Sequence, residues 1–188
     1  IRDCLLSRGL GDVYKRQREE TTTLCLIPAV RTVTTLPLIA AGGIATGEAM
    51  LAARVLGAEG VQIGTRFALT AESSANEVFK DYCLHLEEGD TRLLLKKLAP
   101  VRLVRNNFRS AVEAAEAVGA SEEELRILLG RGRAKRGIFE GDLEEGELEI
   151  GQVSVLLHGK GVQSVASVMQ ELVEESRRAW ERMQELDF

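Results

Sequence analysis

Aromatic residues, positive charge and long apolar runs are all scarce in this sequence. Phe, Trp and Tyr make up 4% of the 188 residues, so an aromatic platform that stacks nucleic-acid bases is not expected. Lys and Arg number 24 against 29 Asp and Glu, a formal net charge of −5, whereas nucleic-acid-binding proteins need a concentrated positive surface. We therefore do not expect nucleic acid as a partner. Because no apolar run reaches about 18 residues, we do not expect a membrane as a partner either.

Cysteine is also sparse. Cys4, Cys25 and Cys83 are odd in number and far apart, so they form neither a CxxC pair nor a metal-binding spacing. No charged and then apolar leader precedes a small-residue cleavage site. Both observations favour reduced thiols and a cytoplasmic protein. The apolar fraction of 45% is enough for the core of one domain of ordinary size.

The first 17 residues differ from the rest of the chain. They carry four basic and two acidic residues, whereas the remainder is acidic, and they show no sustained period of two or 3.6. A native N-terminal arm is one interpretation of residues 1–17. We favour the other interpretation, a foreign or artefactual segment that fold reasoning should exclude.

Two short apolar segments, each followed by glycine, are typical of parallel strands buried on both faces. Residues 36–41 precede Gly42 and Gly43, and residues 60–64 end in a second glycine loop. The intervening segment, 46–56, has a helical pattern that stops at a glycine. Because the connection is this short, we predict adjacent parallel strands in βα units with a right-handed crossover.

Most of the remaining chain is predicted to be helical. The spacing of apolar residues predicts helices over 21–34 and 73–86, a helix pair over 110–130 broken at Gly119, and a long closing helix over 162–186. The expected buried face of the helix over 73–86 consists of Val78, Phe79, Tyr82 and Leu86. The expected stripe of the closing helix consists of Val162, Val165, Met169, Leu172, Val173, Trp180 and Met183. Residues 91–104 are mixed and basic, and 142–149 are acidic, which favours a solvated loop there.

The two glycine loops are the segments that point to a ligand. The sequences AAGGI (40–44) and QIGTRF (62–67) both begin at the carboxyl end of a predicted strand. Glycine lets backbone N–H groups approach an oxyanion closely, and a helix N-terminus and a Thr hydroxyl add donors. TIM barrels place a phosphate site after their seventh and eighth strands. A single GG pair could be only a tight turn, but the two loops at this spacing favour phosphate binding.

Several motifs in the same order resemble the flavin-dependent nitronate monooxygenases, also called 2-nitropropane dioxygenases. They equally resemble the related FMN-containing enoyl-acyl-carrier-protein reductases. The motifs are IAAGGI, LGAEGVQIGTRF, TAESSANEVFK, APVRLVRN and GRGRAKRGIFEGDLEEGELEIGQVS. The resemblance covers roughly residues 18–154, and the closing helix more loosely.

The resemblance implies an α/β fold that is the C-terminal part of a TIM-type (β/α)8 barrel. Its last two βα units would lie in a partial FMN-binding barrel, 18–90, followed by a mostly helical C-terminal region of the same domain, 91–188. The residues that the resemblance assigns to the FMN phosphate are Gly42, Gly43, Gln62, Ile63, Gly64 and Thr65.

The sequence departs from the family pattern upstream of Arg18. In the family, the segment REETTT follows an EAGGHxG motif whose His is the catalytic acid or base, whereas here VYKRQ precedes it. We therefore assign no catalytic residue in this sequence, and we interpret residues 1–17 as a junction. A smaller departure is Val155, where the family usually has Gly.

Other reactive side chains are given structural roles. His85 and His158 match no family position, and Cys25 and Cys83 are expected to pack as small apolar residues. No metal site is expected. The basic residues Arg131, Arg133, Lys135 and Arg136 could touch a phosphate but are more typical of a solvated helix face. For Arg66 the sequence leaves open whether it pairs with an anion or with a carboxylate.

The function expected is an FMN-dependent oxidoreductase that oxidises alkyl nitronates with oxygen, present as a truncated chain. One alternative is an enoyl-acyl-carrier-protein reductase that uses NAD(P)H in fatty-acid synthesis. Another is a non-catalytic fragment that binds phosphate or FMN. The corresponding partners are a nitronate, or an enoyl thioester and acyl carrier protein, and a homodimer is left open.

Overall fold

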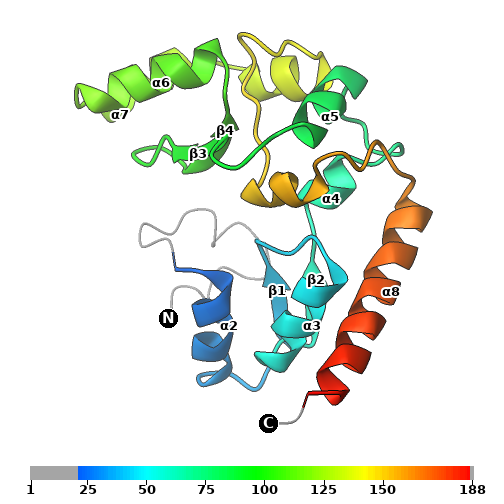
Figure 1. Cartoon of the computed structure of the whole chain (residues 1–188). Helices are drawn as coiled ribbons and strands as arrows, with labels where there is room; N and C mark the ends of the chain where they lie inside the picture. The colour runs from blue at the N-terminus through cyan, green and yellow to red at the C-terminus, as the bar shows by residue number, and fades with distance from the viewer. Residues whose placement is uncertain (1–20, 187–188) are drawn as a thin grey trace.

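The computed structural model describes residues 21–186, which form helices around two small sheets (Figure 1). The segment 1–17, interpreted above as a junction, lies outside the described residues. In chain order the elements are α2 (Thr23–Arg31), β1 (Ile39–Ala41), α3 (Gly47–Val55), β2 (Gly60–Gln62), α4 (Thr65–Ala68), α5 (Glu77–Leu84), β3 (Thr91–Leu94), β4 (Val101–Val104), α6 (Asn107–Ala117), α7 (Glu122–Leu129), the π-helical turn η2 (Lys135–Phe139), the 3₁₀ helix η3 (Gln152–Leu157) and α8 (Val165–Gln184).

Strands β1 and β2 are adjacent and parallel, as predicted. Ile39 lies opposite Gly60, and Ala41 lies opposite Gln62. Helix α3 connects the two strands, and the Thr46 side chain caps it by accepting a hydrogen bond from the Ala49 N–H. Since the strands run in the same direction, both glycine loops leave the same end of the sheet.

The prediction that both faces of these strands are buried is wrong. Ala40 is buried in a cluster with Ile27 of α2 and Ala53 of α3. Ile39, whose side chain points to the opposite face, is 57% exposed. Ala41, on the same face as Ile39, is half-buried, so this second face is only partly covered by the described residues.

The C-terminal region contains an antiparallel hairpin that the sequence patterns did not indicate. Thr91 of β3 pairs with Val104 of β4, and Leu94 pairs with Val101. The period of two is obscured because three leucines follow one another at 93–95. Leu94, the last residue of β3, and Leu95, just after it, are both buried against α6 and α7. Apart from this hairpin, the regular elements described after residue 91 are helical, as expected.

The acidic segment 142–149 is only partly a solvated loop. Its second half packs along the hairpin: the Val104 N–H donates to the Leu148 carbonyl at 2.9 Å, and the Ile150 N–H donates to the Arg102 carbonyl at 3.3 Å. Leu148 is buried, and burial raises the pKa of the neighbouring Glu147 carboxyl. The acidic composition concealed this packing because apolar residues alternate with the carboxylates.

Two predicted helix faces differ from the observed ones. In α5, Phe79 is buried as expected, whereas Val78 is exposed and Cys83 takes its place in the core. In α8 the residues with buried side chains are Val168, Leu172 and Ala179. Of the predicted stripe, Leu172 is buried as expected, whereas five members are exposed: Val162, Met169, Val173, Trp180 and Met183.

Helix α8 packs on α3 with a close backbone approach at Gly47. A Cβ atom at Gly47 would lie 2.2 Å from the Ser176 nitrogen and 2.4 Å from the Leu172 carbonyl oxygen. The absence of a side chain at Gly47 therefore allows the backbones of the two helices to touch.

Candidate cofactor site

The two glycine loops begin side by side at the carboxyl ends of β1 and β2. The register that pairs Ala41 with Gln62 fixes this placement. Gly42 and Gly43 have φ angles of +89° and +75°, a region that other L-residues reach only at a cost of about 1–2 kcal/mol. The turn after β1 therefore depends on glycine at both positions.

The backbone of these loops is accessible. Gly42, Gly43, Gln62 and Gly64 are exposed, and Thr65 is half-buried. Gly64 has an ordinary φ of −93°, and a Cβ atom there would meet no atom within 4 Å. Neither packing nor backbone conformation within the described chain thus explains a glycine at this position, whereas the close approach of a ligand would.

Protein groups already use N–H donors at the start of α3. The first N–H groups of any helix lack intrahelical partners. In α3, however, the Gly47 N–H donates to Glu175 Oε2 at 2.8 Å, and the Ala49 N–H donates to Thr46. The expectation that α3 offers its N-terminus to a phosphate is therefore corrected, because protein groups already occupy those amides.

Two hydroxyl groups hold the loops in place. Thr23 of α2 donates to the Gly42 carbonyl oxygen at 2.8 Å. Thr65 Oγ1 accepts from the Gly151 N–H at 3.1 Å, and a Cβ atom at Gly151 would lie only 2.5 Å from that oxygen. A hydroxyl that accepts here still has its own proton to donate. Sequence reasoning missed Thr23 and Gly151, although both lie in the segments that carry the family resemblance.

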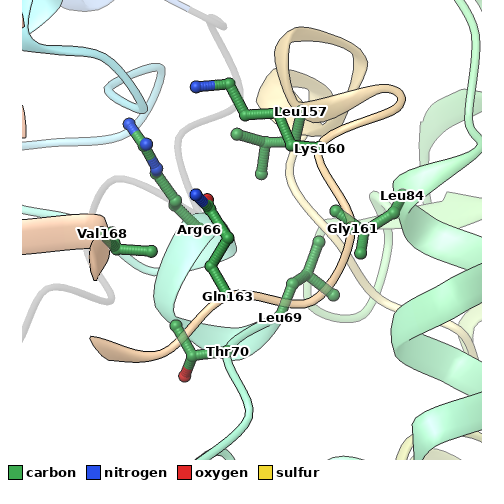
Figure 2. Close-up of a pocket in the computed structure, with 9 residues that line it drawn as sticks. All are labelled: Arg66, Leu69, Thr70, Leu84, Leu157, Lys160, Gly161, Gln163 and Val168. Atoms are coloured by element: carbon green, nitrogen blue, oxygen red, sulfur yellow. The ribbon is translucent and has the colours of Figure 1, made fainter. Parts of the chain in front are cut away.

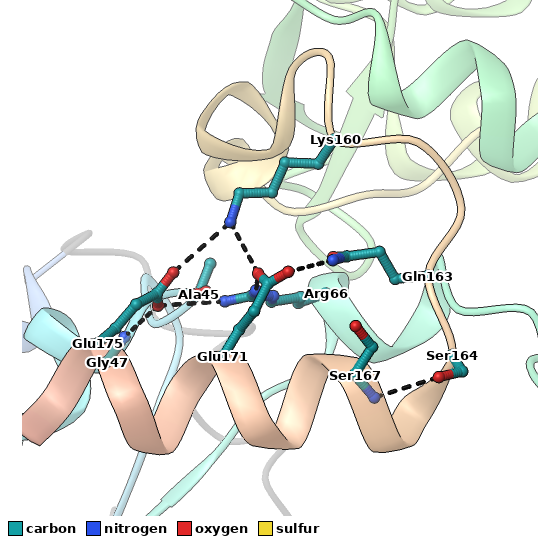
Figure 3. A network of polar contacts seen from close by, with 9 residues as sticks. All are labelled: Ala45, Gly47, Arg66, Lys160, Gln163, Ser164, Ser167, Glu171 and Glu175. Atoms are coloured by element: carbon teal, nitrogen blue, oxygen red, sulfur yellow. Dashed lines mark hydrogen bonds and ion pairs between the residues drawn. The ribbon is translucent and has the colours of Figure 1, made fainter.

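Arg66, which follows the second loop, pairs with carboxylates. Its side chain is 2% exposed and forms ion pairs with Glu171 and Glu175 of α8 (Figure 3). It also donates to the Ala45 carbonyl oxygen at 2.7 Å. The sequence left open whether Arg66 pairs with a bound anion or with a carboxylate of the protein, and the structure shows the second.

A small cavity lies beside Arg66, between α4, η3 and α8 (Figure 2). Its volume is about 10 Å³, which corresponds to about one water molecule. The buried Arg66 Nε has no hydrogen-bond partner within residues 21–186. This cavity suits a single water and is far too small for a flavin ring.

The other candidate residues lie apart from the glycine loops. His85 and His158 contact each other edge to face with 6.2 Å between ring centroids, and each Nδ1 lies near a backbone carbonyl. Cys83 is buried, which raises the pKa of its thiol to about 12, so it packs as predicted. Cys25 is exposed, which corrects the expectation that it packs on an apolar face.

Of the four basic residues, Arg131, Lys135 and Arg136 are exposed, as predicted for a solvated face, whereas Arg133 is half-buried. Arg133 lies 4.5 Å above the Phe108 ring and donates to the Leu129 carbonyl. Arg136 pairs with Asp142 at 2.5 Å.

No group of three or more His, Cys, Asp or Glu in the described part of the chain could hold a metal ion. Over the same residues, no helix is both long and apolar enough to cross a membrane.

Comparison with known proteins gives the same family throughout. The sequence model of the nitronate monooxygenase family matches residues 8–175. A probable nitronate monooxygenase of Staphylococcus haemolyticus is 46% identical over 85 residues, which are 45% of this chain and 24% of that protein. A protein of the same description from Staphylococcus aureus (strain JH9) is 44% identical over 77 residues, 41% of this chain and 22% of that protein.

Solved structures share the fold over most of the chain. FabK from Thermotoga maritima has a TM-score of 0.77 at 34% identity, over 88% of this chain and 52% of that one. Nitroalkane oxidase from Streptomyces ansochromogenes has a TM-score of 0.68 at 26% identity, over 89% of this chain and 48% of that one. The chain thus spans about half the length of these structures.

The family match includes both glycine loops, the Thr23 and Gly151 segments that hold them, and most of α8. The overall fold is α/β, and members of this family are oxidoreductases. The chain belongs to the nitronate monooxygenase family.

Proposed function

We propose that the two glycine loops bind the phosphate of FMN. The observation that carries this proposal is the pair of exposed glycine loops at the carboxyl ends of paired parallel strands. The N–H groups of Gly42 and Gly43 would donate from the first loop, and those of Gly64 and Thr65 from the second. Gln62 and Ile63 would line the approach, and the Thr65 hydroxyl would add one donor.

The reaction proposed is FMN-dependent oxidation of an alkyl nitronate with oxygen. FMN, when bound, supplies the redox chemistry, and the protein supplies position and electrostatics. The similarity to probable nitronate monooxygenases and to nitroalkane oxidase supports this class of substrate. We further propose that the described βα units are the end of a (β/α)8 barrel, as the coverage of about half of the solved structures suggests.

Reduction of an enoyl thioester is the second candidate activity. It is favoured by the motifs shared with the FMN-containing enoyl reductases, and NAD(P)H and acyl carrier protein would then be the electron donor and the partner. Because the glycine loops serve the cofactor in either case, they do not discriminate between the two substrates.

The test is a comparison of FMN with riboflavin, which lacks the phosphate. Titration of flavin fluorescence with the 188-residue chain should give a dissociation constant at least about tenfold lower for FMN, since about 1.4 kcal/mol corresponds to a factor of ten. Gly43→Ala should reduce that preference, because alanine moves the turn out of its left-handed conformation.

Gly159→Ala is a matched control for this titration. Gly159 has the same φ of +75°, lies outside both loops, and a Cβ atom there would meet no atom within 4 Å. The control should therefore keep the wild-type preference for FMN. Equal affinity for both flavins in the wild type, or equal loss in both variants, would contradict the proposed site.

A further inference from the structure

A charged cluster around the buried Arg66 lies next to the first glycine loop and has no part in the proposed function so far. It consists of Arg66, Lys160, Gln163, Glu171 and Glu175, and we refer to it as the α8 cluster (Figure 3). Both carboxylates project from α8. They reach residues that follow the glycine loops, more than 100 positions earlier in the sequence.

The α8 cluster holds the first glycine loop at its carboxyl end. Arg66 donates to the Ala45 carbonyl at 2.7 Å, two residues after Gly43. Glu175 Oε2 accepts from the Gly47 N–H at 2.8 Å and also lies 3.4 Å from Arg66 Nη1. The loop is thus fixed from both sides of Thr46 by one ion pair.

The charges within the α8 cluster balance. Lys160 Nζ lies 3.0 Å from Glu171 Oε2 and 3.5 Å from Glu175 Oε1, so two cations face two carboxylates. The hydrogen bond from Lys160 is the main reason why the pKa of Glu171 lies below its usual range. With their charges matched, neither cation is left to attract a phosphate to this cluster.

The consequence concerns the first turn of α3. A helix N-terminus ordinarily favours an anion, and here the Glu175 carboxylate is that anion. A phosphate at the same place would meet a like charge. The remaining backbone donors are those of the two glycine loops, whose orientation depends on the fixed positions of Ala45 and Gly47.

We propose that Glu175 and Arg66 are positioning residues for the phosphate loop. Glu175 occupies the N-terminus of α3, and Arg66 holds the Ala45 carbonyl, so that the amides of Gly42 and Gly43 stay directed at the ligand. This inference rests on the proposed FMN site. It predicts an effect on binding of the phosphate that is separate from general stability.

The experiment measures dissociation constants for FMN and for riboflavin with the full chain and its variants. Glu175→Ala should weaken FMN binding about tenfold and riboflavin binding less than about twofold. Glu175→Gln should stay within about threefold of the wild type for FMN, because an amide oxygen still accepts from the Gly47 N–H. Glu174→Ala is the matched control, since the side chain of this exposed neighbour accepts a hydrogen bond from Gln170 of the same helix and takes no part in the α8 cluster.

The outcomes separate the inference from the proposed site. If Glu175→Ala weakens both flavins equally, or neither, the positioning role is overturned while the site stands. If the wild type does not bind FMN, both are overturned. Should Glu175→Ala lose its cooperative unfolding transition, Arg66→Lys takes its place. A single ammonium nitrogen cannot take the places of both Arg66 Nη1, which donates to the Ala45 carbonyl, and Nη2, which pairs with Glu171, so the same selective loss for FMN is expected.

Discussion

Replacing Gly47 with alanine is expected to lower the free energy of unfolding by about 3 kcal/mol, at the upper end of the usual cost of overpacking. The new Cβ atom would lie 2.2 Å from the Ser176 nitrogen, 2.4 Å from the Leu172 oxygen and 2.5 Å from Glu175 Cβ. Two of these are backbone atoms of α8, so relief requires movement of the whole helix. That movement of α8 would also break the hydrogen bond between the Gly47 N–H and Glu175.

The loss of stability expected for Gly47→Ala is opposite in sign to the usual effect of replacing glycine with alanine in a helix. In an exposed helix, alanine is more favourable than glycine by about 1 kcal/mol, and Gly47 begins a helix without a left-handed φ. Urea unfolding followed by circular dichroism gives the free energies. Gly64→Ala serves as the control, because a Cβ atom there has open space. A Gly47→Ala variant as stable as the wild type would refute the packing of α8 on α3.

The second large effect concerns turnover. We expect the 188-residue chain to oxidise nitronates and to reduce enoyl thioesters at least about 100-fold more slowly than a full-length homologue, even when it is loaded with FMN. A positioned acid or base typically contributes about 10²–10⁴-fold, and the family's His motif does not occur in the sequence before Arg18. His85 and His158 contact each other and not the glycine loops.

Steady-state assays of both reactions, beside a full-length homologue, measure this difference. The double variant His85→Ala/His158→Ala is the control and should show the same residual rate as the chain itself. Turnover within about tenfold of the homologue, a barrier difference of only about 1.4 kcal/mol, would contradict the expectation. So would a further loss in the double variant, because it would give one of these histidines a catalytic role.

The parts of the fold that could be predicted are those with local signals. The unit β1–α3–β2 follows from short apolar segments that end in glycine, and its parallel pairing was confirmed. The break at Gly119 was also confirmed: its φ is +81°, and Ser121 and Glu124 then form the capping box of α7. Each of these features is encoded by residues within a few positions of one another.

The features that were missed depend on contacts between distant residues. The side of α8 that faces the protein depends on contacts with Gly47 and Arg66, which lie more than 100 residues earlier in the sequence. The apolar stripe of α8 therefore did not predict most of its buried residues. The hairpin of β3 and β4 did not show a period of two because three leucines follow one another at 93–95, and Leu94 and Leu95 enter the same core cluster. For the site, the glycine loops were predictable, but their support by Thr23, Gly151 and Glu175 was not.

Mapping the phosphate of FMN onto backbone amides tests the central claim most directly. Amide signals of the isotope-labelled chain would be compared between saturation with FMN and saturation with riboflavin. The account predicts that the differences between the two flavins centre on Gly42, Gly43, Gly64 and Thr65, while the Gly47 amide, already bonded to Glu175, changes little. Differences centred on Gly47 and the first turn of α3, or on residues away from both loops, would contradict it.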